Sequence, residues 1–185
     1  MQEDVKEIEL VNYLKYKVKI SNTFIEKKGN RIFFKDIVSI KCKSWRQFAS
    51  YYGAKTFHGN FNRIILVDNR KNKIDLNFSS TSEESFKNFN YILSKATSPL
   101  VQKTINDIKS GTEVSIHNLK LTQAGIYKKS LFGTTFIEWG SCLDAIIDRG
   151  FVDIIKLDEK KFSSTHIWKR NAILIPSIVK SFNKK

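Results

Sequence analysis

The chain has 185 residues, of which 41% are hydrophobic, and a formal net charge of +14. This hydrophobic content is enough for one good core or two small ones, and it excludes a disordered chain, which would carry fewer aromatic and aliphatic residues. No uncharged apolar run approaches the roughly 18 residues that span a bilayer, and the acidic start Met-Gln-Glu-Asp is unlike a secretory signal. We therefore expect a cytoplasmic protein whose only membrane contact would be peripheral.

The two cysteines, Cys42 and Cys142, lie far apart in the sequence and have no metal-ligand spacing around them. In a reducing compartment this pattern predicts buried or half-buried thiols without a disulfide bond.

The positive charge comes mostly from lysine, with 26 lysines against six arginines. Ile, Lys and Asn are all abundant, as an A/T-rich genome would produce, so compositional drift explains part of the excess. The distribution is uneven, because residues 15–73 contain 15 basic and three acidic residues, a net charge of +12. A field of this kind attracts phosphate-bearing partners, either nucleic acid or an anionic membrane.

The first predicted elements are strands. Residues 24–28 and 31–37 flank the turn residues Gly29-Asn30, which favours a β-hairpin with lysines beside its turn. Residues 38–42 and 73–78 alternate apolar and polar side chains, and residues 63–67 form an apolar run, so each predicts a strand.

The period then changes to that of a helix. Thr81 and Glu84 fit a capping box, and the apolar residues from Phe86 to Ala96 follow at helical spacing. A second helix is predicted to start at Ser98-Pro99 and to end at Gly111.

The second half repeats this layout. A lead-in over residues 114–121 precedes a hairpin with Lys128-Lys129 on one side and the turn residues Gly133-Thr134, followed by strands at residues 144–147, 151–157 and 162–168. Asn171 is a candidate cap for a final helix, although Pro176 favours a later start. The predicted organisation is a first unit at residues 1–97, a connecting helix at 98–111 and a second unit at 112–185.

This plan of strands closed by an amphipathic helix, used twice, resembles the pleckstrin-homology (PH) fold, and more narrowly an uncharacterised family of tandem PH-like proteins of bacterial type. The residues that carry the resemblance are Gly111, Gly125-Ile126, Phe136-Ile137-Glu138-Trp139, Gly150-Phe151-Val152, Trp168 and Asn171-Ala172-Ile173-Leu174. The resemblance implies an α+β, mainly β fold with two PH-like units, each an antiparallel sheet or partial barrel with a C-terminal helix. It also implies a binding or scaffolding role without naming a ligand.

No pattern in the sequence indicates catalysis or a cofactor. The three histidines, His58, His117 and His166, have no metal spacing, and the motifs of serine hydrolases, zinc peptidases, phosphate loops and dinucleotide sites are missing. We therefore expect a protein that is not an enzyme and needs no cofactor or metal.

The first candidate binding site is the turn with Lys27, Lys28 and Arg31. The resemblance supports it, because in PH folds that bind phosphoinositides the loop of the first hairpin supplies basic side chains to the phosphates. The alternative is a solvated turn whose lysines protect a sheet edge.

The second candidate is the stretch from Lys41 to Arg63, in which cations alternate with aromatic residues. Such a pattern suits base stacking with phosphate contacts, or insertion at a membrane interface. The alternative is a loop or short helix that buries its aromatic residues, since Trp45, Phe48 and Tyr52 are spaced i, i+3, i+7. The candidate binding residues in this stretch are Lys43, Trp45, Arg46, Tyr51, Tyr52, Lys55 and Arg63.

The third candidate is the second hairpin, in which Lys128 and Lys129 precede the apolar pair Leu131-Phe132. Such a tip could dip into a membrane, and an ordinary surface loop is the alternative.

Together these features favour a binding module whose basic first unit engages anionic lipid headgroups or an acidic protein. A nucleic-acid-binding protein is one alternative, and an assembly module that pairs sheet edges between copies is another.

Overall fold

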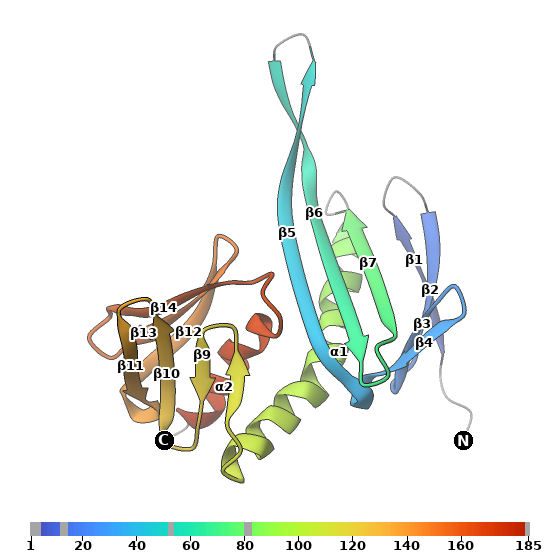
Figure 1. Cartoon of the computed structure of the whole chain (residues 1–185). Helices are drawn as coiled ribbons and strands as arrows, with labels where there is room; N and C mark the ends of the chain where they lie inside the picture. The colour runs from blue at the N-terminus through green and yellow to red at the C-terminus, as the bar shows by residue number, and fades with distance from the viewer. Residues whose placement is uncertain (1–4, 12–14, 52–53, 80–82, 184–185) are drawn as a thin grey trace. The chain divides into compact units, whose positions relative to one another are not determined.

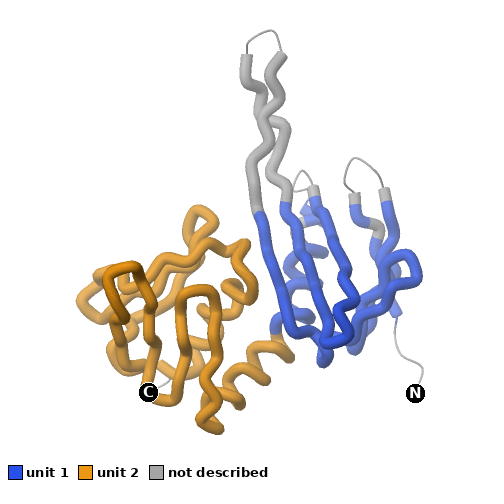
Figure 2. The backbone as a smooth tube through the Cα atoms, viewed as in Figure 1, with its two compact units in different colours: residues 1–97 blue, residues 98–185 orange. Residues whose placement is uncertain are grey.

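The structure is a computed structural model that describes residues 5–11, 15–51, 54–79 and 83–183. At residues 9, 11, 15, 44–51, 54–61, 79 and 86 it describes the backbone alone. The chain divides into two compact units, residues 1–97 and 98–185 (Figure 2). It is mainly β, with four antiparallel sheets and a C-terminal helix, as the sequence led us to expect.

The first unit contains a four-stranded sheet, a three-stranded sheet and the first part of a helix whose last residues, 98–109, belong to the second unit (Figure 1). The first sheet consists of β1 (Lys6–Val11), β2 (Lys15–Ile20), β3 (Phe24–Lys27) and β4 (Asn30–Phe33). After the 3-10 turn η1 (Phe34–Asp36) comes the second sheet, of β5 (Ile37–Tyr51), β6 (Ala54–Asp68) and β7 (Lys73–Ser79), followed by α1 (Glu83–Lys109).

Where the side chains of these strands are described, buried residues largely alternate with more exposed ones, as the period of two in the sequence requires. The largest fully buried side chains among the described residues form this core, namely Leu10, Ile20, Ile25, Ile32, Ile37, Ile40, Ile64, Leu66, Ile74, Leu76 and Phe78 of the strands and their connections, with Ile92 of α1. The ring of Phe78 meets that of Phe89 edge-on, with 5.3 Å between centroids, which anchors the start of α1 against β7.

The second unit follows the same order. Its four-stranded sheet contains β8 (Val114–Ile116), β9 (Leu119–Leu121), β10 (Gly125–Ser130) and β11 (Gly133–Glu138). After η2 (Trp139–Ser141), the strands β12 (Cys142–Asp148), β13 (Phe151–Lys156) and β14 (Lys161–His166) form a three-stranded sheet, and η3 (Ala172–Leu174) leads to α2 (Ile175–Phe182).

Hydrogen bonds at the connections match between the units. The amide of Ser21 donates to Phe24 O at 3.0 Å, and that of Thr122 donates to Gly125 O at 2.9 Å. Likewise the amide of Asn69, just after β6, donates to Asp36 O at the end of η1 at 3.0 Å. The amide of Leu157, just after β13, donates to Ser141 O at the end of η2, also at 3.0 Å. The internal repeat inferred from short sequence matches is therefore a repeat of backbone structure.

The lysine-bearing hairpins are not the first hairpins of their units. They are formed by β3 with β4 and by β10 with β11, and in the first unit β1 and β2 precede them. The sequence interpretation missed β1 and β2, although residues 15–20 alternate lysine with apolar residues. The turn positions also differ, because Lys28-Gly29 and Leu131-Phe132 connect the paired strands.

The alternative of a loop or short helix over residues 41–63 is wrong for residues 41–51 and 54–63, which lie in strands. β5 and β6 pair from Ile37 to Tyr51, whereas β7 pairs only with the Phe61–Val67 part of β6. The i, i+3, i+7 spacing of aromatic residues is compatible with either structure, and it is cross-strand pairing that favours the extended one.

The predicted break at Ser98-Pro99 is also wrong, because α1 is continuous with Pro99 inside it. Ile92, Ala96 and Leu100 are all buried and form one stripe across the proline. A proline inside a helix costs about 3 kcal/mol, and the burial of this stripe offsets that cost. The predicted end holds, since Gly111 has φ +89° and its amide donates to Ile108 O at 3.1 Å.

At the C-terminus, Pro176 lies in the first turn of α2, as the later of the two predicted starts requires. Asn171 makes no capping hydrogen bond to η3 and instead adopts a left-handed conformation with φ 62°. Both cysteines are buried free thiols, which confirms the prediction for them.

Candidate functional site

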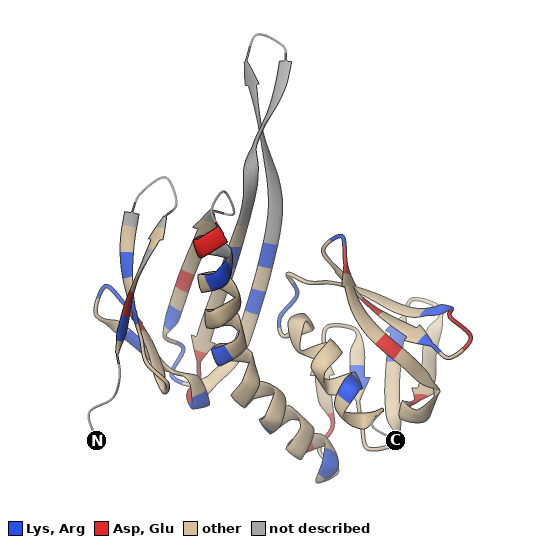
Figure 3. Ribbon diagram, turned by 180° about the vertical axis from the view of Figure 1, so that it is seen from behind, with Lys and Arg blue, Asp and Glu red and all other residues tan. Residues whose placement is uncertain are grey.

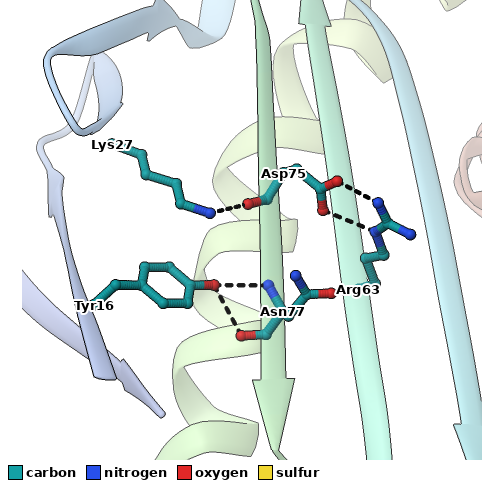
Figure 4. Close-up of polar contacts among 5 residues, drawn as sticks. All are labelled: Tyr16, Lys27, Arg63, Asp75 and Asn77. Carbon is teal, nitrogen blue, oxygen red and sulfur yellow. Dashed lines mark hydrogen bonds and ion pairs between the residues drawn. The ribbon is translucent and has the colours of Figure 1, made fainter. Parts of the chain in front are cut away.

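Strand β7 lies at the edge of its sheet, and side chains from the first sheet bind its outer backbone groups (Figure 4). The Tyr16 hydroxyl donates to Asn77 O at 2.9 Å and accepts from the Asn77 amide at 2.7 Å. The Lys27 ammonium donates to Asp75 O, and Asn30 Nδ2 donates to Lys73 O at 2.9 Å. We call these three side chains the edge seam, because they replace the strand-to-strand bonds that an edge lacks.

The side chain of Asp75 points to the other side of β7 and pairs with Arg63 of β6 (Figure 4). Arg63 Nε donates to Asp75 Oδ1 at 2.8 Å, and a second bond joins Arg63 Nη2 to Oδ2. This bidentate geometry fixes both groups on the outer face of the sheet.

The surroundings shift the pKa values of these groups. Burial lowers the pKa of Lys27, against the attraction of Asp75, and raises the pKa of Tyr16. The hydrogen bonds from Arg63 hold the pKa of Asp75 below its usual value, with smaller contributions from the charges of Lys73 and Lys27. The Lys27 ammonium also lies 4.2 Å from the centre of the Tyr16 ring.

The raised pKa of Tyr16 predicts a loss of stability at alkaline pH. The neutral hydroxyl stabilises the fold fully below the unfolded pKa of about 10, and this contribution disappears as pH rises through the higher folded pKa. We expect Tyr16→Phe to lower the free energy of unfolding by about 1 kcal/mol at pH 7. Urea titrations from pH 7 to 11 should show this difference shrinking above pH 10, and a constant difference would contradict the prediction.

Cations gather on the outer face of the β5–β7 sheet. In register, Lys41 stands in a row with Ile65 and Asp75, and Lys43 stands in a row with Arg63 and Asn77. Among the described positions of these rows and of the row with Lys73, Asp75 is the only acidic residue. We define the cationic surface as Lys28, Lys41, Lys43, Arg63 and Lys73, of which the four lysines are exposed.

Lys28 joins this surface because the seam holds its turn against β7. It follows Lys27 directly, has φ 51°, and its charge contributes to lowering the pKa of Lys27. Elsewhere, Lys and Arg are spread over many elements of both units (Figure 3), as compositional drift would produce. What distinguishes the cationic surface is that its five cations share neighbouring rows and a turn with Asp75 as the only acidic residue in those described rows.

The structure separates the candidate residues of the first turn. Lys27 belongs to the seam. Arg31 pairs with Glu26 on the neighbouring strand, with Nη2 2.7 Å from Oε2, and lies over the Phe24 ring. Lys28 alone extends from the turn as an exposed lysine.

Other candidates lie outside what the structure describes. Tyr52 is not described, and for Trp45, Arg46, Tyr51 and Lys55 only the backbone is described. Their register is defined, with Trp45 opposite Phe61 and Arg46 opposite Asn60.

The second unit repeats the division of roles within the lysine pair. Lys128 Nζ donates to Phe162 O of β14 at 3.1 Å, as Lys27 does to Asp75 O of β7. Lys129 is exposed. The inward position of the first lysine of each pair could have been predicted from the sequence. Strand alternation places Lys27 on the face of buried Ile25 and Lys128 on the face of buried Ile126.

Sequence reasoning also missed Tyr16, Asn30, Lys73 and Asp75 as parts of the site. Lys73 and Asp75 could have been found, since they occupy the polar positions of an alternating strand. Tyr16 could not, because 61 residues separate it from its partner Asn77.

Within the described residues, no group of His, Cys, Asp or Glu is arranged to hold a metal ion, and no helix has the length and apolarity needed to cross a membrane. No protein-family model matches the chain, and no curated protein matches it in sequence.

Proposed function

We propose that the chain is a non-enzymatic binding module built from two PH-like units, and that its first unit holds an acidic partner on the cationic surface. The order of four strands, three strands and a helix, present in each unit, supports the PH-like assignment.

The excess of cations over acidic residues on neighbouring rows of the β5–β7 sheet is the observation that carries the proposal. Arg63 is fixed by Asp75, whereas Lys28, Lys41 and Lys73 extend into solvent. An ammonium on a flexible stem acts as a point charge and imposes little geometry on its partner. Such lysines suit a diffuse polyanion, and an anionic lipid surface is the partner that we favour.

Charge reversal at Lys28 and Lys73 tests the proposal without disturbing the seam. A lysine near an anionic membrane contributes about 1 kcal/mol, so Lys28→Glu with Lys73→Glu should weaken binding to phosphatidylserine-containing vesicles at least about tenfold. Co-sedimentation at low salt, with neutral phosphatidylcholine vesicles for comparison, measures the effect.

The matched control is Lys103→Glu with Lys180→Glu, which changes the net charge equally at exposed positions outside the cationic surface. Equal loss in both double variants would mean that only net charge matters and would contradict the proposal. Gel shifts with nucleic acid across a salt series test the alternative partner. Tighter binding to nucleic acid than to vesicles would identify nucleic acid, and not lipid, as the partner of the cationic surface.

A further inference from the structure

The turn between β10 and β11 presents two apolar side chains to solvent. Leu131 is 98% exposed and Phe132 is 100% exposed. Neither contributes to the core, and neither has a positive φ, which would restrict the residue types that the turn accepts. Single exposed apolar residues are common on protein surfaces, whereas adjacent exposed apolar side chains are a feature of interaction sites.

The fold itself does not require this pair. The corresponding turn of the first unit, between β3 and β4, uses Lys28-Gly29 with φ values of 51° and 78°. The same hairpin is therefore built with a polar turn in one unit and an apolar turn in the other.

Two basic side chains, Lys129 and His117, lie beside the apolar tip. Residues 114–137 contain three lysines and no acidic residue. The β8–β9 turn lies beside the tip, since the Lys129 amide donates to Asn118 O at 2.9 Å. His117 of that turn, Lys120 and Lys129 line a pocket of about 270 Å³ on the outer face of the sheet. Lys120 is paired with Glu113 at 3.0 Å, and Lys128 bonds inward to Phe162 O.

We propose that the β10–β11 tip inserts into the interfacial region of an anionic bilayer. Leu131 and Phe132 enter the boundary between headgroups and acyl chains, and Lys129 with His117 meets the headgroup phosphates behind them. A stable protein interface buries roughly 800 Å² on each partner, which a two-residue tip cannot supply. A bilayer accepts a small apolar tip flanked by cations at headgroup depth.

This inference rests on residues of the second unit and does not depend on the cationic surface of the first. We expect Leu131→Ser with Phe132→Ser to weaken binding to phosphatidylserine-containing vesicles at least about tenfold, because two apolar side chains lose their burial. The matched control is Leu143→Ser with Leu157→Ser, which removes apolar side chains that are 50% and 58% exposed elsewhere in the same unit.

A depth measurement separates insertion from simple electrostatic attraction. The native thiols Cys42 and Cys142 are buried, so a maleimide fluorophore reacts selectively with a new exposed cysteine. A label at Ser130→Cys should shift to the blue on vesicles and be quenched by brominated acyl chains. A label at the exposed position Ser177→Cys on α2 should show neither change.

The outcomes distinguish the two proposals. An unquenched label at residue 130, or unchanged binding of the Leu131→Ser, Phe132→Ser variant, overturns insertion whatever the cationic surface does. Quenching at residue 130 that persists in the Lys28→Glu, Lys73→Glu variant supports insertion independently. If vesicle binding is lost in that variant alone, while the tip variant binds normally, the first unit is the membrane contact and the tip is not.

Discussion

Replacing Gly125 with alanine should destabilise the second unit by about 3 kcal/mol or more, because the added methyl group has no space. A Cβ at this position would lie 2.2 Å from Ile137 O, 2.8 Å from Phe136 Cε2 and 2.9 Å from Glu138 Cα. Two of these three atoms are backbone atoms of β11, which pairs with β10 at this point. The strands would have to separate, and urea unfolding followed by tryptophan fluorescence should report the loss.

Gly140 provides the matched control for this substitution. It lies in η2, and a Cβ built there meets no atom within 4 Å. Gly140→Ala should therefore change the free energy of unfolding by no more than about 0.5 kcal/mol. Comparable losses in the two variants would contradict the steric explanation.

Replacing Lys27 with methionine should lower the stability of the first unit by about 2 kcal/mol, because a charged hydrogen bond to Asp75 O is lost and nothing else in the seam replaces it. Methionine keeps most of the apolar stem, which limits the packing loss. The cation–π contact with Tyr16 also disappears. Thermal or urea unfolding monitored by circular dichroism measures the effect.

The neighbouring lysine provides the comparison. Lys28→Met removes the same charge from an exposed turn position and should leave stability within about 0.5 kcal/mol. If the cationic surface binds anions, Lys28→Met should weaken binding while stability holds. Equal stability of the two variants would show that Lys27 does not support the edge of β7.

These expectations change how the lysine pair should be tested. A substitution at Lys27 that abolishes binding could act through local unfolding, because the seam holds the β3–β4 hairpin against β7. Substitutions at Lys28 and Lys73 keep the seam's hydrogen bonds, since Lys73 contributes its carbonyl group and not its side chain. For the same reason, binding by the second unit should be tested with substitutions at Lys129 and not at Lys128, whose ammonium donates to Phe162 O.

Local patterns predicted much of the secondary structure. Residues 38–42, 63–67 and 73–78 lie in strands, because alternation of apolar and polar residues suits a half-buried strand. The stretch from Phe86 to Ala96, with its helical period, lies in α1, whereas the predicted cap Thr81 lies outside the described residues. One alternative, a loop or short helix that includes Trp45 and Phe48, failed because the same spacing fits a strand. The predicted helix break failed because buried side chains on both sides of Pro99 offset the local cost of the proline.

The amino-acid sequence by itself determined the basic character of residues 15–73, the repeated lysine pair and the mainly antiparallel plan, since these depend on composition and local periodicity. Only the tertiary structure decided that Lys27 and Lys28 have different roles. Two adjacent lysines look alike in a sequence, but Lys27 ends β3 on the face of buried Ile25, whereas Lys28 lies in the turn that follows, with φ 51°. One ammonium then meets a carbonyl group 48 residues away, and the other meets solvent.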